Sequence, residues 1–229
     1  MSSPSSSAPP ASRFNAGYDT WGLIWSYVHD VLVLNAGLAL TTAPLLAALA
    51  ADRHPWRAPA PFVLLSLLVG PALAGAFGYL ERVHAHGQAR AADLLVAYRA
   101  TFRPALARWA VYTLPAWAAG TDAVLLRHTA LGLAVSPALA VAALLALGTG
   151  VTAMARVAAG ERRLARPRRQ ALLAPAHLLL RRWPLALFNL AVAAVALLAI
   201  GRQPLLGLTA VPGCALIVIW RNLGAMHGR

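Results

Sequence analysis

Six apolar runs separated by polar connections dominate this 229-residue chain and limit what it can fold into. Most of them match the roughly 17 to 25 residues that an α-helix needs to cross a bilayer. The runs cover residues 31–51, 60–80, 105–120, 131–155, 183–200 and 204–220. Hydrophobic residues make up 59% of the chain and charged residues only 12%, so a water-soluble fold could not bury this much apolar surface. The sequence therefore predicts a membrane protein.

The spanning segments are expected to be helices, because backbone groups in lipid must form hydrogen bonds within the segment. The alternating pattern of a membrane β-strand is absent from the runs. We predict an all-α fold, a polytopic transmembrane helix bundle with about six spans in three hairpins. The run at 105–120 is short and contains Arg108, so it is the weakest span, and five spans is the alternative count.

Arginine is distributed unevenly between the connections. Of the 20 arginines, 16 fall in the terminal segments and in the connections after the second and fourth runs, including the start of the third run. Short arginine-rich loops remain in the cytoplasm, so both termini are predicted to be cytoplasmic and the number of spans even. The net charge of +13 is then explained by topology and by anionic lipid headgroups, and we expect no binding of nucleic acid.

The chain divides into a tail and one transmembrane domain. Residues 1–15 are rich in Ser, Pro and Ala, a composition that cannot bury a core, so we predict a disordered tail. Residues 16–229 form the predicted single transmembrane helical domain. The aromatic-rich stretch 18–28 is expected to lie as a helix at the level of the headgroups.

Several polar or helix-breaking residues lie inside the predicted spans. In lipid, such side chains more often bond across helices than bind a substrate, so we expect them to set helix packing, and a polar cavity is the alternative. The first hairpin is expected to depend on them most. They are Asn35, Thr41, Thr42, Pro44, Gly70, Pro71 and Asn189.

Two basic segments have the spacing of surface helices. In residues 90–108, apolar side chains recur every three or four positions and the charges fall mainly elsewhere around the helix axis. Residues 161–182 begin with an arginine cluster and continue with leucines. Such helices present guanidinium groups to lipid phosphates or to a protein partner. The arginines predicted at this cytoplasmic surface are Arg90, Arg99, Arg103, Arg168 and Arg169.

Catalytic and metal-binding patterns are weak. Glu81 and His84 have the Glu-x-x-His spacing of carboxylate-bridged metal sites, but Asp93 is the only other acid expected nearby. We therefore expect no metal and no cofactor, and no enzymatic activity, since the nucleophile-elbow, zinc-protease and phosphate-loop motifs are all absent. No acid falls inside a run, which disfavours a proton-driven carrier.

Short motifs along residues 18–225 carry a family resemblance. They are Asn35, the segment Thr41-Thr42-Ala43-Pro44, the segment 70–74 (Gly-Pro-Ala-Leu-Ala), Tyr79-Leu80, Phe102-Arg103 and Trp109. This order resembles the YesL family of bacterial integral membrane proteins of unknown function. Gly37 and Leu38 stand where a tryptophan is expected in that family, and the connection after the fourth run is unusually basic.

The resemblance implies a multi-pass protein of the bacterial plasma membrane with no established activity. The family is often found beside carbohydrate-uptake ABC transporter components, which the resemblance implies as partners. We therefore expect an accessory or partner-binding component linked to carbohydrate uptake. A small-solute transporter or permease subunit is the alternative function.

Overall fold

The computed structural model describes residues 16–51, 59–87, 89–160, 168–202 and 204–227. Within these ranges, the side chains of residues 16–20, 23, 168–172, 201, 204–210 and 226–227 lie outside the described part. All regular elements in this part of the chain are helices, as predicted, and it contains no strand. The helices are α1 (Ala16–Ala51), α2 (Pro59–Ser66), α3 (Val69–His86), α4 (Ala91–Leu126), α5 (Ala130–Ala158), α6 (Arg168–Arg181), α7 (Trp183–Arg202) and α8 (Pro204–His227). The predicted tail, residues 1–15, lies outside the described residues.

Four helical stretches in the described ranges are long and apolar enough to cross a membrane. They are Ile24–Ala51, Pro59–His86, Ala130–Ala158 and Trp183–Ile200. Helix α8 contributes a shorter apolar stretch, Val211–Ala225. The predicted third span, 105–120, belongs to α4 and is not among the stretches apolar enough to cross a membrane. Arg108, Tyr112 and Pro115 interrupt its apolar sequence.

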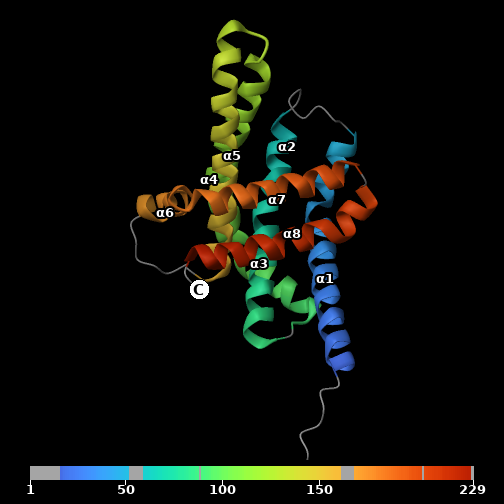
Figure 1. Cartoon of the computed structure of the whole chain (residues 1–229). Helices are drawn as coiled ribbons and strands as arrows, with labels where there is room; N and C mark the ends of the chain where they lie inside the picture. The colour runs from blue at the N-terminus through green and yellow to red at the C-terminus, as the bar shows by residue number, and fades with distance from the viewer. Residues whose placement is uncertain (1–15, 52–58, 88, 161–167, 203, 228–229) are drawn as a thin grey trace, which may run out of the picture.

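The helices run in two directions (Figure 1). Helices α1, α2, α3, α4 and α5 lie alongside one another, and the α4–α5 hairpin extends beyond its neighbours at its connecting end. Helices α7 and α8 form a second hairpin that crosses the direction of the others and packs on α1. The third predicted hairpin therefore lies across the first two instead of beside them.

Helix boundaries differ from the predicted segments at three places. The aromatic-rich stretch 18–28 is continuous with the first span in α1, and residues 90–108 are continuous with 105–120 in α4. The second predicted span is instead interrupted, because α2 ends at Ser66 and α3 begins at Val69. Pro71 lacks the N–H group that would bond to the carbonyl of Leu67, which explains a break at this position.

The core lies where α1, α3, α4, α5 and α8 meet. Its fully buried large side chains include Leu34, Phe77, Tyr79, Met154 and Val157. The exterior is also apolar: Leu131 is 80% exposed and Leu133 is 72% exposed. Apolar surface this extensive is unfavourable in water and is normal against lipid. Packing and composition therefore agree that this is a membrane protein.

Candidate functional site

Asn35 lies in a tight seam between α1 and α8. Its side chain is 4% exposed, and its Oδ1 accepts a hydrogen bond of 2.6 Å from the backbone N–H of Gly213. A Cβ atom at position 213 would lie 2.9 Å from the carbonyl oxygen of Val31, so only glycine allows this approach. Pro212 precedes this glycine inside α8. The buried amide therefore joins two helices that are far apart in the sequence.

Asn189 lies in the seam between α7 and α8. Its Oδ1 accepts a hydrogen bond of 2.8 Å from Nδ2 of Asn222, which also lies 3.4 Å from the carbonyl oxygen of Leu185. Asn189 also borders a cavity of about 190 Å³ that is otherwise lined mainly by apolar residues of α5, α7 and α8. Both predicted asparagines thus make side-chain bonds to α8 and hold helix seams.

The predicted polar group at 41–44 behaves differently. Oγ1 of Thr41 donates to the carbonyl of Gly37 at 2.8 Å, and Oγ1 of Thr42 donates to that of Leu38 at 2.7 Å. These bonds stay within α1, where the expectation was a bond across helices. Pro44 is exposed on the same helix. Hydroxyl groups four residues from a carbonyl commonly bond back in this way, which satisfies them without a second helix.

Gly70 contacts a tryptophan of α4. A Cβ atom at position 70 would lie 2.3 Å from both Cβ and Cγ of Trp109, and one at Gly150 would lie 2.8 Å from Cζ3 of the same indole. The ring is therefore clamped between a glycine of α3 and a glycine of α5. The neighbouring Pro71 is fully buried. Gly70 thus joins the first predicted hairpin to the second.

Two tryptophans of α4 donate hydrogen bonds to Ser66, the last residue of α2, at the break before α3. Nε1 of Trp109 donates to the carbonyl of Ser66 at 3.0 Å, and Nε1 of Trp117 donates to Oγ of Ser66 at 2.9 Å. Sequence reasoning did not assign these bonds to Ser66 and Trp117. The sequence did offer a signal for these bonds: Ser66 is a polar residue inside an apolar run, five residues before Pro71, which breaks the helix.

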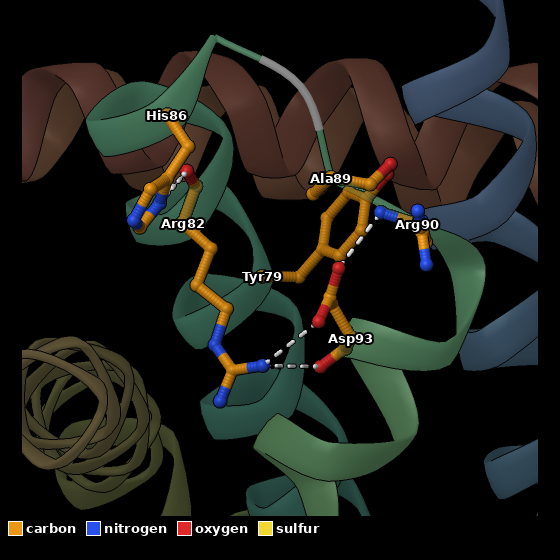
Figure 2. A network of polar contacts seen from close by, with 6 residues as sticks. All are labelled: Tyr79, Arg82, His86, Ala89, Arg90 and Asp93. Carbon is orange, nitrogen blue, oxygen red and sulfur yellow. Dashed lines mark hydrogen bonds and ion pairs between the residues drawn. The ribbon is translucent and has the colours of Figure 1, made fainter.

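A polar network gathers at the end of the molecule where α3 and α5 end and α4 begins, called the basic end below. Tyr79 donates a hydrogen bond of 2.7 Å to Oδ1 of Asp30, which connects α3 to α1. Tyr79, Arg82, Arg90 and Asp93 lie together where α3 ends and α4 begins (Figure 2). Arg82 forms an ion pair of 3.2 Å with Asp93, and Asp93 accepts from the backbone N–H of Arg90 at 2.8 Å. The Arg82–Asp93 pair is more than a third exposed, so its role is to orient helix ends more than to stabilise them.

Glu81 and His84, the pair with the Glu-x-x-His spacing, have other partners, and so does the nearby His86. Glu81 accepts a hydrogen bond of 3.2 Å from Nε1 of Trp220, and the ring of His84 meets the same indole edge to face at 5.5 Å. His86 lies 3.1 Å from the carbonyl oxygen of Arg82 through Nδ1. In the described part of the chain, no three side chains of His, Cys, Asp or Glu come together as metal ligands.

A cavity of about 370 Å³ opens beside the indole of Trp220, between α3, α5 and α8. Its wall carries Glu81 and His84 from α3, Arg156 from α5 and Arg221 from α8. Trp220, Leu223, Ala155 and Ala159 supply most of the apolar part of the wall. We call this space the basic-end cavity.

The predicted surface arginines of α4 are exposed. Arg90, which directly precedes α4, and Arg99 and Arg103 within it are all exposed. Arg99 and Arg103 line a shallow hollow with Tyr98 and Phe102. The two aromatic rings meet edge to face at 5.5 Å. The side chains of Arg168 and Arg169 lie outside the described part, although their backbone begins α6.

Comparisons with protein-family models, with curated proteins and with solved structures found no match to this chain. Its class therefore rests on its own features: an all-helical protein with helices long and apolar enough to cross a membrane.

Proposed function

We propose that the chain is a multi-pass protein of the bacterial plasma membrane, with six spans and both termini in the cytoplasm. The distribution of arginine supports this topology, since the basic end carries the connections that the positive-inside rule assigns to the cytoplasm. Four helical stretches that are long and apolar enough support the membrane assignment. In this proposal, α4 provides the third span despite Arg108, and α8 provides the sixth through the uncharged run 204–220.

Cysteine labelling tests this topology. Cys214 is the only cysteine, so Cys214→Ser provides a background for single-cysteine variants. A membrane-impermeant maleimide added to intact cells should label Arg57→Cys, His128→Cys and Arg202→Cys, and should label His86→Cys only after lysis. If α7 and α8 lie in the plane of the membrane, Arg202→Cys will not be labelled from outside, which would contradict six spans while keeping the first four.

We further propose that the protein acts as an accessory component that binds a partner through its cytoplasmic surface. The observation that carries this proposal is how the two asparagines are used: the buried Asn35 bonds to the backbone of α8 and the half-buried Asn189 bonds to Asn222, so both hold helix seams. A carrier needs polar side chains along a path through the bundle. Packing of this kind supports a rigid bundle that presents a surface more than a solute pathway.

The proposed docking surface is the hollow of α4 formed by Tyr98, Arg99, Phe102 and Arg103. Arginines beside aromatic rings are common at protein interfaces because they combine charge with apolar contact area. The resemblance to the YesL family supports ABC transporter components as the partner and carbohydrate uptake as the setting.

Co-purification tests this surface. Arg99→Glu with Arg103→Glu reverses two charges and should abolish recovery of the partner from solubilised membranes, while Arg127→Glu, a single reversal on the opposite connection, should retain it. Equal recovery from all variants would contradict the docking surface. Uptake of a solute by purified protein in vesicles, without a partner, would instead favour the transporter.

A further inference from the structure

The basic-end cavity has the dimensions of a ligand site. Its volume of about 370 Å³ lies within the roughly 300 to 1,000 Å³ typical of small-molecule pockets. Three helices that are distant in the sequence form its wall, so the space exists only in the folded protein. Gly224 of α8 lines it, and a Cβ atom at that position would meet nothing within 4 Å. The cavity therefore has open space beside the backbone.

The charges in the wall favour an anion. Arg156 and Arg221 provide two guanidinium groups against the single carboxylate of Glu81. Glu81 already accepts the N–H of Trp220, and Arg221 is held from the outside by a hydrogen bond to the hydroxyl of Tyr27. Helices α3, α5 and α8 all end nearby, and their terminal carbonyls carry partial negative charge. A third guanidinium group offsets this at α8, where Arg182 donates to the carbonyl of Ala225 at 2.7 Å.

The two guanidinium groups fit a phosphate group better than they fit an uncharged, wholly apolar ligand. A guanidinium group is planar and donates two parallel N–H bonds to phosphate oxygens, and two such groups can hold one phosphate from two sides. Trp220, Leu223, Ala155 and Ala159 form an apolar wall next to the charged one. A ligand with a phosphate joined to an apolar body fits both.

We propose that the basic-end cavity binds a phosphate-bearing anion through Arg156 and Arg221. This inference rests on the proposed membrane topology, which places the cavity at the level of the cytoplasmic headgroups. The phosphodiester of an anionic lipid and free phosphate are the two sources of the group. Binding of a lipid there would tie α3, α5 and α8 together at the end where the docking surface of α4 begins.

Native mass spectrometry of the full-length protein, delipidated in detergent, tests the site. The probes are phosphatidylglycerol, diacylglycerol with the same acyl chains but no phosphate, and inorganic phosphate. We expect one phosphatidylglycerol to be retained at least tenfold more tightly than diacylglycerol. Arg156→Gln with Arg221→Gln should weaken this binding by roughly tenfold or more, because charge-assisted hydrogen bonds are lost.

Gly224→Leu provides a second, independent variant. It keeps both arginines and fills the cavity from a position with room for a side chain, so it should block binding without disturbing the wall. Arg127→Gln removes one charge far from the cavity and should bind as the unaltered protein does. Circular dichroism of each variant confirms that helix content is retained.

The outcomes distinguish a lipid headgroup from free phosphate as the bound group, and they show when the proposal fails. Retention of phosphatidylglycerol, with no binding of inorganic phosphate, identifies a lipid headgroup, whereas binding of inorganic phosphate alone identifies a soluble ligand. The proposal is overturned if the folded variants bind phosphatidylglycerol and inorganic phosphate as the unaltered protein does. It is also overturned if the unaltered protein binds neither of these two probes more tightly than diacylglycerol. The result is independent of Arg99 and Arg103, so failure of the docking surface leaves this test intact.

Discussion

Replacing Gly70 with alanine tests whether the clamp around Trp109 holds α3 against α4. The added Cβ would lie 2.3 Å from Cβ and Cγ of the tryptophan, where carbon atoms normally approach to about 3.5 Å. These two atoms are the stem of the side chain, and the far side of the ring is pinned by Gly150. The ring cannot move away, so the helices must separate by about 1.2 Å.

The cost follows from three contributions. Overpacking costs about 1 to 3 kcal/mol. Separation by this distance also stretches the 3.0 Å bond from Nε1 of Trp109 to the carbonyl of Ser66, which adds about 1 to 2 kcal/mol. Alanine returns about 1 kcal/mol because it forms helices better than glycine does. The free energy of unfolding should therefore fall by about 2.5 kcal/mol.

Unfolding by sodium dodecyl sulfate in mixed micelles, followed by circular dichroism, measures this free energy. Gly224→Ala is the matched control, because the same substitution in α8 meets nothing within 4 Å and should be neutral or stabilising. A loss below about 0.5 kcal/mol for Gly70→Ala, with the control behaving as expected, would refute the clamp.

Three further substitutions separate bonds that join helices from bonds within one helix, all measured by the same unfolding assay. Trp109→Phe keeps most of the packing but loses the bond to Ser66, so it should cost about 1 to 2 kcal/mol; no change would remove that bond as a stabilising contact. Tyr79→Phe removes the bond to Asp30 between α3 and α1 and should cost about 1 kcal/mol, and an equal loss when Asp30 is already alanine would show that the two groups are not coupled. Thr42→Val loses only a bond within its own helix and should stay within about 0.5 kcal/mol of the unaltered protein; a larger loss would mean that the hydroxyl has a partner on another helix.

Local features of the fold followed from local sequence. The apolar runs predicted helices and a membrane setting, because the length and composition of a segment decide whether it can lie in lipid. The break before α3 was not predicted, although Pro71 explains it. The start of α4 is fixed by Asp93, whose carboxylate accepts from the backbone N–H of Arg90 at 2.8 Å. The predicted segment ends at 28 and 105 differ from the structure, since nothing in those stretches stops a helix from continuing.

The candidate site shows what local pattern leaves open. Asn35 was identified as a polar residue in an apolar run, but its partner, Gly213, lies 178 positions away. Trp109 was noticed within a motif, while its place between Gly70 and Gly150 required three helices to be positioned together. Many pairings of equally apolar helices have similar energies, so the choice among them depends on shape at close contact.

The sequence by itself determined the apolar helices, the excess of arginine on alternate connections, and the few polar side chains that need hydrogen-bond partners in an apolar surrounding. Only the tertiary structure decided that α7 and α8 cross the other helices and that the asparagines close seams. It also decided that Arg156 and Arg221 face one cavity. The physical reason is that periodicity and composition act over a few turns, whereas contacts between distant helices form only when glycines and bulky rings meet in register.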